Sequence, residues 1–332
     1  MALSDSATNS REMRSRAVRR LAMILVLVAV VVPGALLYGI LIPSYLRGRD
    51  SSPILDVAVE TVEPADQLAS SEMILRAADM GNKTVIMTTL NDAWTEPGSV
   101  LDLFLESFRI GNGTSQLLNH LVFITMGQKA HERCTSMRGH CFDLNTKGAN
   151  LSEQKDYNTP GYLDITWQRL DFQRQVLEKG YDFIFTDTDI LWFRNPLPHF
   201  YPQGDFQVSC DRFFGNATDL ENWPSNGFNY VRSNNRTISF FKYWYSARTK
   251  YPQDHDQAVF NYIKHDAYLR ELGLTIRFLD SKYFHGLCEI RSRDWDAVCT
   301  MHANCRVGLS SKLSELRGML EEWKKYISGN HS

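Results

Sequence analysis

The stretch FIFTDTDILWF, residues Phe183–Phe193, places two aspartates inside an apolar run. Its first three residues have the apolar character of a buried strand, and its last four residues favour burial in a packed loop. Unpaired carboxylates are costly in such surroundings. Asp187 and Asp189 therefore need compensating partners, which indicates a binding site at the end of a strand.

Helical and strand-like patterns alternate on both sides of this stretch. The patterns predict helices over 70–79, 98–110 and 161–180, and strands over 83–90, 119–126 and 181–187. Such alternation predicts an α/β fold with a mostly parallel sheet and covering helices. Ligands of these sheets bind beyond the carboxyl ends of the strands. Thr88, which follows the apolar residues TVIM, is therefore a candidate ligand contact beside the two aspartates.

Length and composition are those of an ordinary globular protein. The chain has 332 residues, of which 43% are hydrophobic and 22% are charged, so it has room for one large domain or two small ones. The formal net charge is −2. The chain therefore lacks the overall basic field that favours nucleic acid, and we expect no nucleic-acid partner.

The N-terminal region contains an uncharged apolar segment over 21–42, directly after a cluster of arginines. Its length suits a membrane-spanning helix. A buried helix and a cleaved signal peptide are the alternatives, but the run is longer than a signal h-region and shows no obvious cleavage site. The arginines predict a cytosolic tail over 1–20. A stem over 43–70 and a lumenal domain over 71–328 would follow, giving a single-pass type II membrane protein.

Cysteines and glycosylation sequons are consistent with this orientation, because all of them follow the apolar segment. The six cysteines are Cys134, Cys141, Cys210, Cys288, Cys299 and Cys305, and the sequons begin at Asn82, Asn112, Asn150, Asn216, Asn235 and Asn330. The sequence contains no C-x-x-C motif, which would indicate a zinc site. The short spacings within Cys134–Cys141 and Cys299–Cys305 suit small disulfide loops. The sequence leaves the connectivity open.

An Asp-x-Asp motif after a buried strand can bring two carboxylates to one hard cation such as Mn²⁺ or Mg²⁺. An ion held by Asp187 and Asp189 could also hold a diphosphate leaving group. Two alternatives are surface acids that cap a helix and a phosphotransferase nucleophile. The second alternative usually has Gly-Thr directly after the motif, and Ile190 and Leu191 stand there instead.

Further motifs extend the pattern toward the C-terminus: NGFNYVRSNNRT over 226–237, YPQDHDQAVFN over 251–261 and CTMHANCRVGLSSK over 299–312. From about Lys83 to Trp323 the chain resembles the nucleotide-diphospho-sugar transferases of glycosyltransferase family 77, a largely plant group of Golgi enzymes. The resemblance implies a GT-A fold, a nucleotide-sugar donor that is usually a UDP-sugar, a divalent metal ion, and transfer with retention at the anomeric carbon.

The resemblance also assigns roles at the metal and the diphosphate. It makes Asp189 a direct metal ligand and places Asp187 near the ribose and the metal. His302 would complete the metal site, while Gly308 and Lys312 would meet the diphosphate. The spacing of this last element is longer than in the related enzymes, so a structural hydrogen bond for His302 and a solvated position for Lys312 remain open.

The donor sugar and phosphates would be contacted by residues on other segments. Arg169 is a candidate phosphate or ribose contact, with an exposed, ion-paired helix arginine as the alternative. Asn226 and Gly227 would open a strand, where a glycine permits close approach of the backbone to a sugar. An ordinary tight turn is the alternative for these two residues.

Asp256 and Gln257 resemble the Asp-Gln segment that faces the donor sugar in related retaining enzymes. A carboxylate near the anomeric carbon can stabilise a developing oxocarbenium ion. The alternative is that Asp254 or Asp256 caps the following helix. No pair of acidic residues identifies itself as nucleophile and acid, so the sequence assigns no double displacement.

These inferences predict a Golgi glycosyltransferase whose catalytic residues are Asp187, Asp189 and Asp256. It would move a pentose or galactose-class sugar from a UDP-sugar to a glycan or glycoprotein acceptor, in cell-wall or secretory glycan synthesis. The alternative is a catalytically silent protein that binds carbohydrate or another partner on the same fold.

Overall fold

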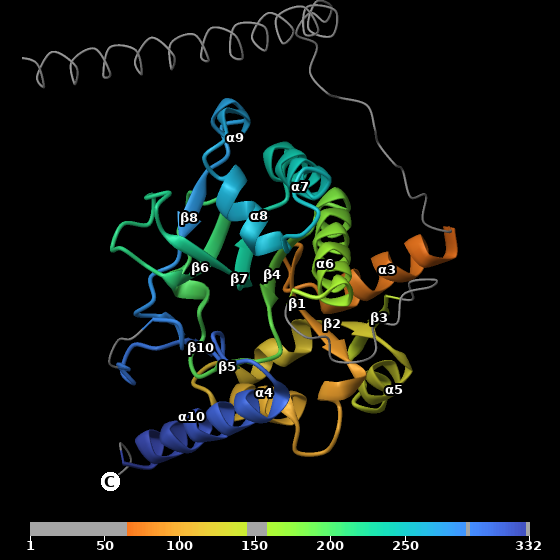
Figure 1. Cartoon of the computed structure of the whole chain (residues 1–332). Coiled ribbons are helices and arrows are strands. Elements are labelled where there is room, and N and C mark those ends of the chain that lie inside the picture. Colours follow the sequence, from red (N-terminus) through yellow and green to blue (C-terminus); the bar gives the residue numbers. More distant parts are fainter. Residues whose placement is uncertain (1–64, 145–157, 290–292, 330–332) are drawn as a thin grey trace, which may run out of the picture. The chain divides into compact units, whose positions relative to one another are not determined.

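The computed structural model of the chain describes residues 65–144, 158–289 and 293–329. Its main element is a seven-stranded sheet with the order β3-β2-β1-β4-β7-β6-β8 (Figure 1). The strands are β1 (Thr84–Asn91), β2 (Leu121–Met126), β3 (His140–Asp143), β4 (Asp182–Thr186), β6 (Phe206–Arg212), β7 (Trp223–Val231) and β8 (Ile276–Phe278). Strand β7 is antiparallel to β4 and β6, and the other pairs of this sheet are parallel. The predicted α/β fold with a mostly parallel sheet is confirmed.

The helices and strands predicted from the sequence all occur. The described α-helices are α3 (Ala65–Ala78), α4 (Val100–Ile110), α5 (Gln128–Ser136), α6 (Pro160–Glu178), α7 (Asn235–Ala247), α8 (Asp256–Ile263), α9 (Ala267–Glu271) and α10 (Leu309–Gly329). Helix α6 begins with Pro160, and the side chain of Thr159 accepts a hydrogen bond from Tyr162 N, as is typical of a helix start. Helix α3 begins within the segment predicted as the stem.

The alternation of side chains along β4 explains the layers. Phe183 and Phe185 point to one face of the sheet, where they pack in a core with α3, α6, α7 and α8. Ile184 points to the other face and packs with α4 and α5. All three side chains are fully buried, and burying each contributes about 1.5–3 kcal/mol. The strand before the two aspartates is therefore fixed on both faces.

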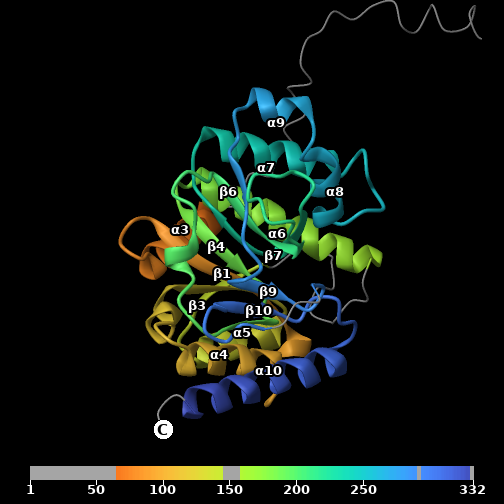
Figure 2. The same ribbon diagram turned by 90° about the vertical axis from the view of Figure 1, so that its left-hand side faces the viewer.

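A smaller sheet lies between the large sheet and α10 (Figure 2). It has the order β5-β10-β9, with β5 (Ile190–Trp192), β10 (Thr300–His302) and β9 (Phe284–Gly286). The residues after the two aspartates were predicted to be a packed loop. That prediction was wrong for 190–192, because these residues pair with β10 along an antiparallel register.

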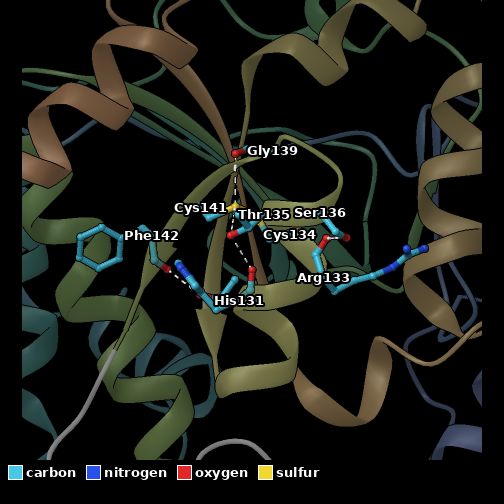
Figure 3. The surroundings of a disulfide bond; sticks show 9 residues. His131, Arg133, Cys134, Thr135, Ser136, Gly139, Cys141 and Phe142 are labelled. Atoms are coloured by element: carbon cyan, nitrogen blue, oxygen red, sulfur yellow. Dashed lines mark hydrogen bonds between the residues drawn. A yellow bond between two sulfur atoms is a disulfide. The ribbon is translucent and has the colours of Figure 1, made fainter.

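Two disulfides occur among the described residues. Cys134 of α5 pairs with Cys141 of β3, as the short spacing predicts (Figure 3). Cys305 pairs with Cys288 and leaves Cys299 free and buried. Of the two spacings that suit small disulfide loops, the one between Cys299 and Cys305 is therefore not used. The reason is that β9 and β10 are parallel neighbours, so the residues that follow them, including Cys288 and Cys305, come together.

The predicted tail over 1–20, membrane segment over 21–42 and most of the stem over 43–70 lie outside the described residues, as do the sequons at Asn150 and Asn330. Within the part of the chain that the structure describes, no helix combines the length and apolarity needed to cross a bilayer.

Candidate active site

The two aspartates of the opening stretch and His302 form one cluster. Each contributes a potential metal-ligand atom, and these atoms all lie within 4.8 Å of one another. His302 Nε2 lies 3.3 Å from Asp189 Oδ1 and 3.8 Å from Asp187 Oδ2. The sequence analysis assigned these three residues to the metal, and the structure brings them together.

The backbone holds this cluster through the small sheet. Ile190 N donates to Asp187 O at 3.1 Å and closes a tight turn around the motif. His302 pairs with Ile190 across β10 and β5. Ala303 N donates to Asp189 O at 3.0 Å. The strand that carries the imidazole is thus hydrogen-bonded to the turn that carries the carboxylates.

Gly227 lies directly against the cluster. Its carbonyl accepts a hydrogen bond of 2.7 Å from Asp187 N. A Cβ atom at this position would lie 2.5 Å from His302 Cε1 and 2.7 Å from Asp187 Oδ2. The prediction that Asn226 and Gly227 open a strand was wrong, because both lie inside β7. The pairing of β7 with β6 is interrupted between Ser225 and Asn229, and such an irregularity re-aims side chains near a site.

Two cations contact the carboxylates. Lys312 Nζ of α10 pairs with Asp189 Oδ2. Arg169 of α6 bridges two acids, with Nη1 3.1 Å from Asp187 Oδ1 and Nη2 2.7 Å from Asp256 Oδ2. Arg169 is only 9% exposed. Arg169 is therefore not an exposed helix arginine, and Lys312 is not a solvated lysine, so both alternatives were wrong.

Electrostatics differ between the two aspartates. Burial acts to raise the pKa of Asp189, but the charges of Lys312 and His302 outweigh it, and the pKa is lowered. Burial raises the pKa of Asp187, which the charge of Arg169 offsets only in part. For His302, burial acts to lower the pKa, whereas the charge and hydrogen bond of Asp189 raise it, and the net shift is upward.

Asp256 is a buried, ionised carboxylate behind the cluster. It accepts hydrogen bonds from Arg169 and from Asn226 Nδ2. Burial acts to raise its pKa, but the charge of Arg169 and the hydrogen bond from His255 lower the pKa to about 2. Helix α8 has His255 at its N-cap without a side-chain capping bond. The alternative that Asp254 or Asp256 serves as the N-cap was therefore wrong.

The side chain of Gln257 links the surroundings of Asp256 to Asp211 and Asn304, two residues that were not predicted from the sequence. Its Oε1 accepts from Asn226 N at 2.9 Å, and its Nε2 donates to Asp211 Oδ2 at 2.9 Å. Asn304 Nδ2 donates to the other oxygen of Asp211 at 2.7 Å. A signal for Asp211 exists, because it follows the strand residues FQVSC much as Asp187 follows FIFT. Asn304 gives no comparable signal.

Thr88 and Gly308 do not join the cluster. The Thr88 side chain is fully buried and lies 3.0 Å from Thr188 Oγ1, so it supports the motif from within the core. Gly308 precedes α10 with a φ of +84°, and its carbonyl accepts a hydrogen bond from Lys312 N at 3.2 Å. A direct donor contact for either residue stays a prediction.

The residues fit a divalent cation. Two carboxylates and one imidazole are common ligands for Mn²⁺ and are compatible with Mg²⁺. Ser225 Oγ lies 3.4 Å from His302 Nδ1, a contact that orients the ring with Nε2 toward the aspartates. The three potential ligands are the residues that the sequence predicted for the metal, and the orientation of the ring adds to that prediction.

Carboxylates that can share one cation, with a lysine and an arginine beside them, suit a substrate that carries a diphosphate. The molecule is thus an α/β enzyme for nucleotide-linked substrates. Residues 116–316 match the model of the nucleotide-diphospho-sugar transferase family, and the chain belongs to this family. The predicted enzyme class, a glycosyltransferase with a nucleotide-diphospho-sugar donor, is confirmed.

Three proteins with known names are similar to this chain over different lengths. An uncharacterized protein of Arabidopsis thaliana, At4g15970, is 44% identical over 269 residues, which cover 81% of this chain and 71% of that protein. A Dictyostelium discoideum UDP-galactose:fucoside alpha-3-galactosyltransferase is 32% identical over 103 residues, 29% of this chain and 15% of that enzyme. The apo structure of mouse xyloside xylosyltransferase 1 is 14% identical with a TM-score of 0.44, and the match covers 67% of this chain and 98% of that one.

Proposed function

We propose that this chain is a metal-dependent, retaining glycosyltransferase that moves a pentose or galactose-class sugar from a UDP-sugar to a glycan or glycoprotein acceptor. The observation that carries the proposal is the convergence of Asp187, Asp189 and His302 within 4.8 Å. The Dictyostelium relative is a galactosyltransferase that uses UDP-galactose, which supports a galactose-class donor.

The residues of this site have separate tasks in donor binding. Asp187, Asp189 and His302 would hold the metal ion, which when bound neutralises the charge of a diphosphate leaving group. Lys312 contacts Asp189 from α10 and would donate to a phosphate oxygen of the donor. Arg169 would hold Asp187 and Asp256 in a fixed relative position, since one guanidinium pairs with both carboxylates.

Asp256 is suited to stabilise positive charge at the anomeric carbon. Its carboxylate is 1% exposed and ionised, and Arg169 and Asn226 fix its position. A carboxylate that is held in this way stabilises an oxocarbenium-like transition state through its charge, without forming a bond. Attack from the face of the departing diphosphate is compatible with this arrangement and with retention.

The proposal includes a Golgi location, type II membrane topology and membership of glycosyltransferase family 77. Its support is the arginine-flanked apolar segment over 21–42, the one-sided sequons and the two disulfides. Enzymatic deglycosylation should lower the mass of the expressed protein, and intact vesicles should protect its C-terminal part from protease. Digestion of that part in intact vesicles, with no glycan present, would reverse the topology.

The activity is tested with the purified full-length chain and a panel of UDP-galactose, UDP-xylose and UDP-arabinose. We expect UDP release from at least one donor with Mn²⁺ and none in excess chelator. Asp189→Ala and Asp189→Asn should both abolish release, because the amide keeps the shape but loses the charge that binds the ion. Asp171→Asn, a change on α6 away from the cluster, is the control and should retain activity.

Two outcomes would contradict the proposal. Full activity in chelator would remove the metal from the reaction, and an active Asp189→Asn variant would move the site elsewhere. Absence of UDP release from every donor, with a folded chain, would favour the catalytically silent binding protein.

A further inference from the structure

A cavity of about 370 Å³ lies beside the residues assigned to the donor. Its lining residues are Asp211, Trp223, Pro224, His255, Gln257, Ala258 and Asn261. The volume falls at the lower end of the range for small-ligand sites. We name this cavity the Trp223 pocket.

Trp223 presents an unusually exposed indole to this pocket. It is 54% exposed, although tryptophan is largely buried in most proteins. Arg212 pairs with Trp223 across β6 and β7, and Arg212 Cζ lies 5.2 Å from the centroid of the ring. A cation at this distance is attracted to an aromatic face and holds the ring in place. The indole is therefore a fixed aromatic surface that is open to solvent.

Asp211 supplies a hydrogen-bond acceptor in the same pocket. The β6–β7 register shifts between Cys210 and Arg212, so Asp211 lies at an irregularity that turns its side chain out of the ladder. Gln257 and Asn304 each donate one hydrogen bond to this carboxylate, one to each oxygen. A carboxylate has about four acceptor positions, so capacity remains for ligand hydroxyls.

The chemistry of the lining favours a neutral, hydroxyl-rich ligand. An aromatic face next to a carboxylate suits a sugar ring, whose C–H surface packs on indole while its hydroxyls donate to the carboxylate. The lining residues include no lysine or arginine. Arg212 lies over the Trp223 ring and not among the lining residues, whereas Asp211 lines the pocket itself. The diphosphate of a donor therefore fits the side of Lys312 and Arg169 better.

The pocket connects to the donor side through one side chain. Gln257 accepts a hydrogen bond from Asn226 N and donates to Asp211, so its side-chain amide lies between the Trp223 pocket and the donor side and contacts residues of both. Asn226 in turn donates to Asp256, the carboxylate proposed to face the anomeric carbon. A sugar in the pocket would thus lie next to the position where transfer takes place.

We infer that the Trp223 pocket binds a sugar ring of the acceptor glycan, with the ring packed on Trp223 and its hydroxyls bonded to Asp211. This inference rests on the proposed glycosyltransferase function and adds the part of the site that receives the acceptor.

Binding is tested without catalysis, by saturation-transfer NMR on the purified full-length chain. The probes are the methyl glycosides of galactose, xylose, arabinose and fucose, without donor or metal. We expect at least one to bind the wild-type chain and Trp223→Ala to weaken its binding about fivefold to tenfold, because the aromatic contact is lost. Trp223→Phe keeps an aromatic face and should bind nearly as well as the wild type.

Tyr268→Ala is the matched control, because Tyr268 is a partly exposed aromatic residue (39%) on α9 that does not line the pocket. It should bind the probes like the wild type. Binding to none of the four probes by the wild-type chain, or equal binding by Trp223→Ala, would overturn the inference.

UDP release in the absence of acceptor separates this inference from the proposed function. Trp223→Ala should release UDP at the wild-type rate, since the donor side is intact. Loss of UDP release together with sugar binding in this variant would assign Trp223 to the donor or to folding and overturn the acceptor role. Absence of UDP release in the wild-type chain would refute the proposed enzyme activity, while the NMR experiment would still decide whether the pocket binds sugar.

Discussion

His302 Nε2 lies 3.3 Å from Asp189 Oδ1, although Asp189 lies in the turn before β5 and His302 is the last residue of β10. The other ring nitrogen lies 3.4 Å from Ser225 Oγ. The imidazole is therefore held on both sides, with one nitrogen toward the carboxylates. This orientation is the one that a metal ligand needs, and it is also compatible with a hydrogen bond alone.

The first prediction separates these two roles of His302. We expect His302→Ala to raise the Mn²⁺ concentration needed for half-maximal UDP release by about tenfold or more, because the site loses a ligand. Excess Mn²⁺ should recover part of the rate. A metal titration and a melting temperature, measured on one preparation, check this expectation.

His120→Ala is the control, because His120 Nδ1 lies 3.0 Å from Ala78 O, away from the cluster. Its loss should lower stability by about 0.5–1.5 kcal/mol and leave the metal titration unchanged. If His302→Ala behaves like His120→Ala in both measurements, His302 is a structural residue and the two aspartates remain as metal ligands.

The second prediction concerns the space at Gly227. Gly227→Ala would place a Cβ 2.5 Å from His302 Cε1 and 2.7 Å from Asp187 Oδ2, so the imidazole or the carboxylate must move. We expect UDP release to fall by about 100-fold, as for a small misplacement of catalytic groups. Gly318→Ala on α10 is the control, since its Cβ would meet nothing within 4 Å, and it should add about 1 kcal/mol of stability. Wild-type activity of Gly227→Ala would show that the cluster is not the site.

The third prediction concerns Arg169, whose guanidinium pairs with both Asp187 and Asp256. Arg169→Lys keeps the charge, but one ammonium cannot span Asp187 and Asp256 as the guanidinium does. We expect a fall of about 1–3 kcal/mol in the free energy of unfolding, since one carboxylate loses its charged partner, together with a large loss of UDP release. Arg174→Lys, on the same helix and also bridging two acids, should leave UDP release unchanged. Equal rates for both variants would argue against a role for Arg169 at the site.

The fourth prediction is a pH dependence of stability outside the active site. Asp205 accepts hydrogen bonds from Arg236, Asn234 and Thr275 N. Burial acts to raise its pKa, but these bonds, led by that of Arg236, lower the pKa. An aspartate with a lowered folded-state pKa adds stability that is present above its unfolded pKa of about 3.9 and is lost as the pH falls through the folded value.

Asp205→Asn should therefore lower the free energy of unfolding by about 1–3 kcal/mol at pH 7, and the difference from the wild type should shrink below about pH 4. Urea unfolding at pH 7 and pH 3 measures both quantities. Glu321→Gln, which removes an exposed partner of Lys324, should show no such dependence. A difference for Asp205→Asn that is equal at both pH values would contradict the assignment.

Local sequence patterns predicted the elements that carry the aspartates. The apolar run of β4 is decided by neighbours in the chain, and the need to compensate Asp187 and Asp189 follows from their apolar flanks. His302 and Lys312 came from the family resemblance, because nothing in their local surroundings distinguishes them from structural residues.

Features that depend on pairing between distant segments were not predicted. The side chain of Asp211 turns out of the ladder because the register shifts between β6 and β7, which neither strand's own pattern shows. The choice of Cys288 as the partner of Cys305 depends on the parallel pairing of β9 and β10. Strand β5 has three residues, too few for an alternation that could be recognised.

The disulfide between Cys288 and Cys305 closes a covalent ring of the chain, and β10 with His302 is part of this ring. A crosslink of this kind restricts the unfolded chain, because the enclosed segment has fewer conformations available. The imidazole is thus linked, through a short covalent ring, to the residues that follow β9. Under the proposed function, this crosslink limits how far one metal ligand can move from the others, and a reducing agent should raise the Mn²⁺ concentration needed for activity even where the large sheet stays folded.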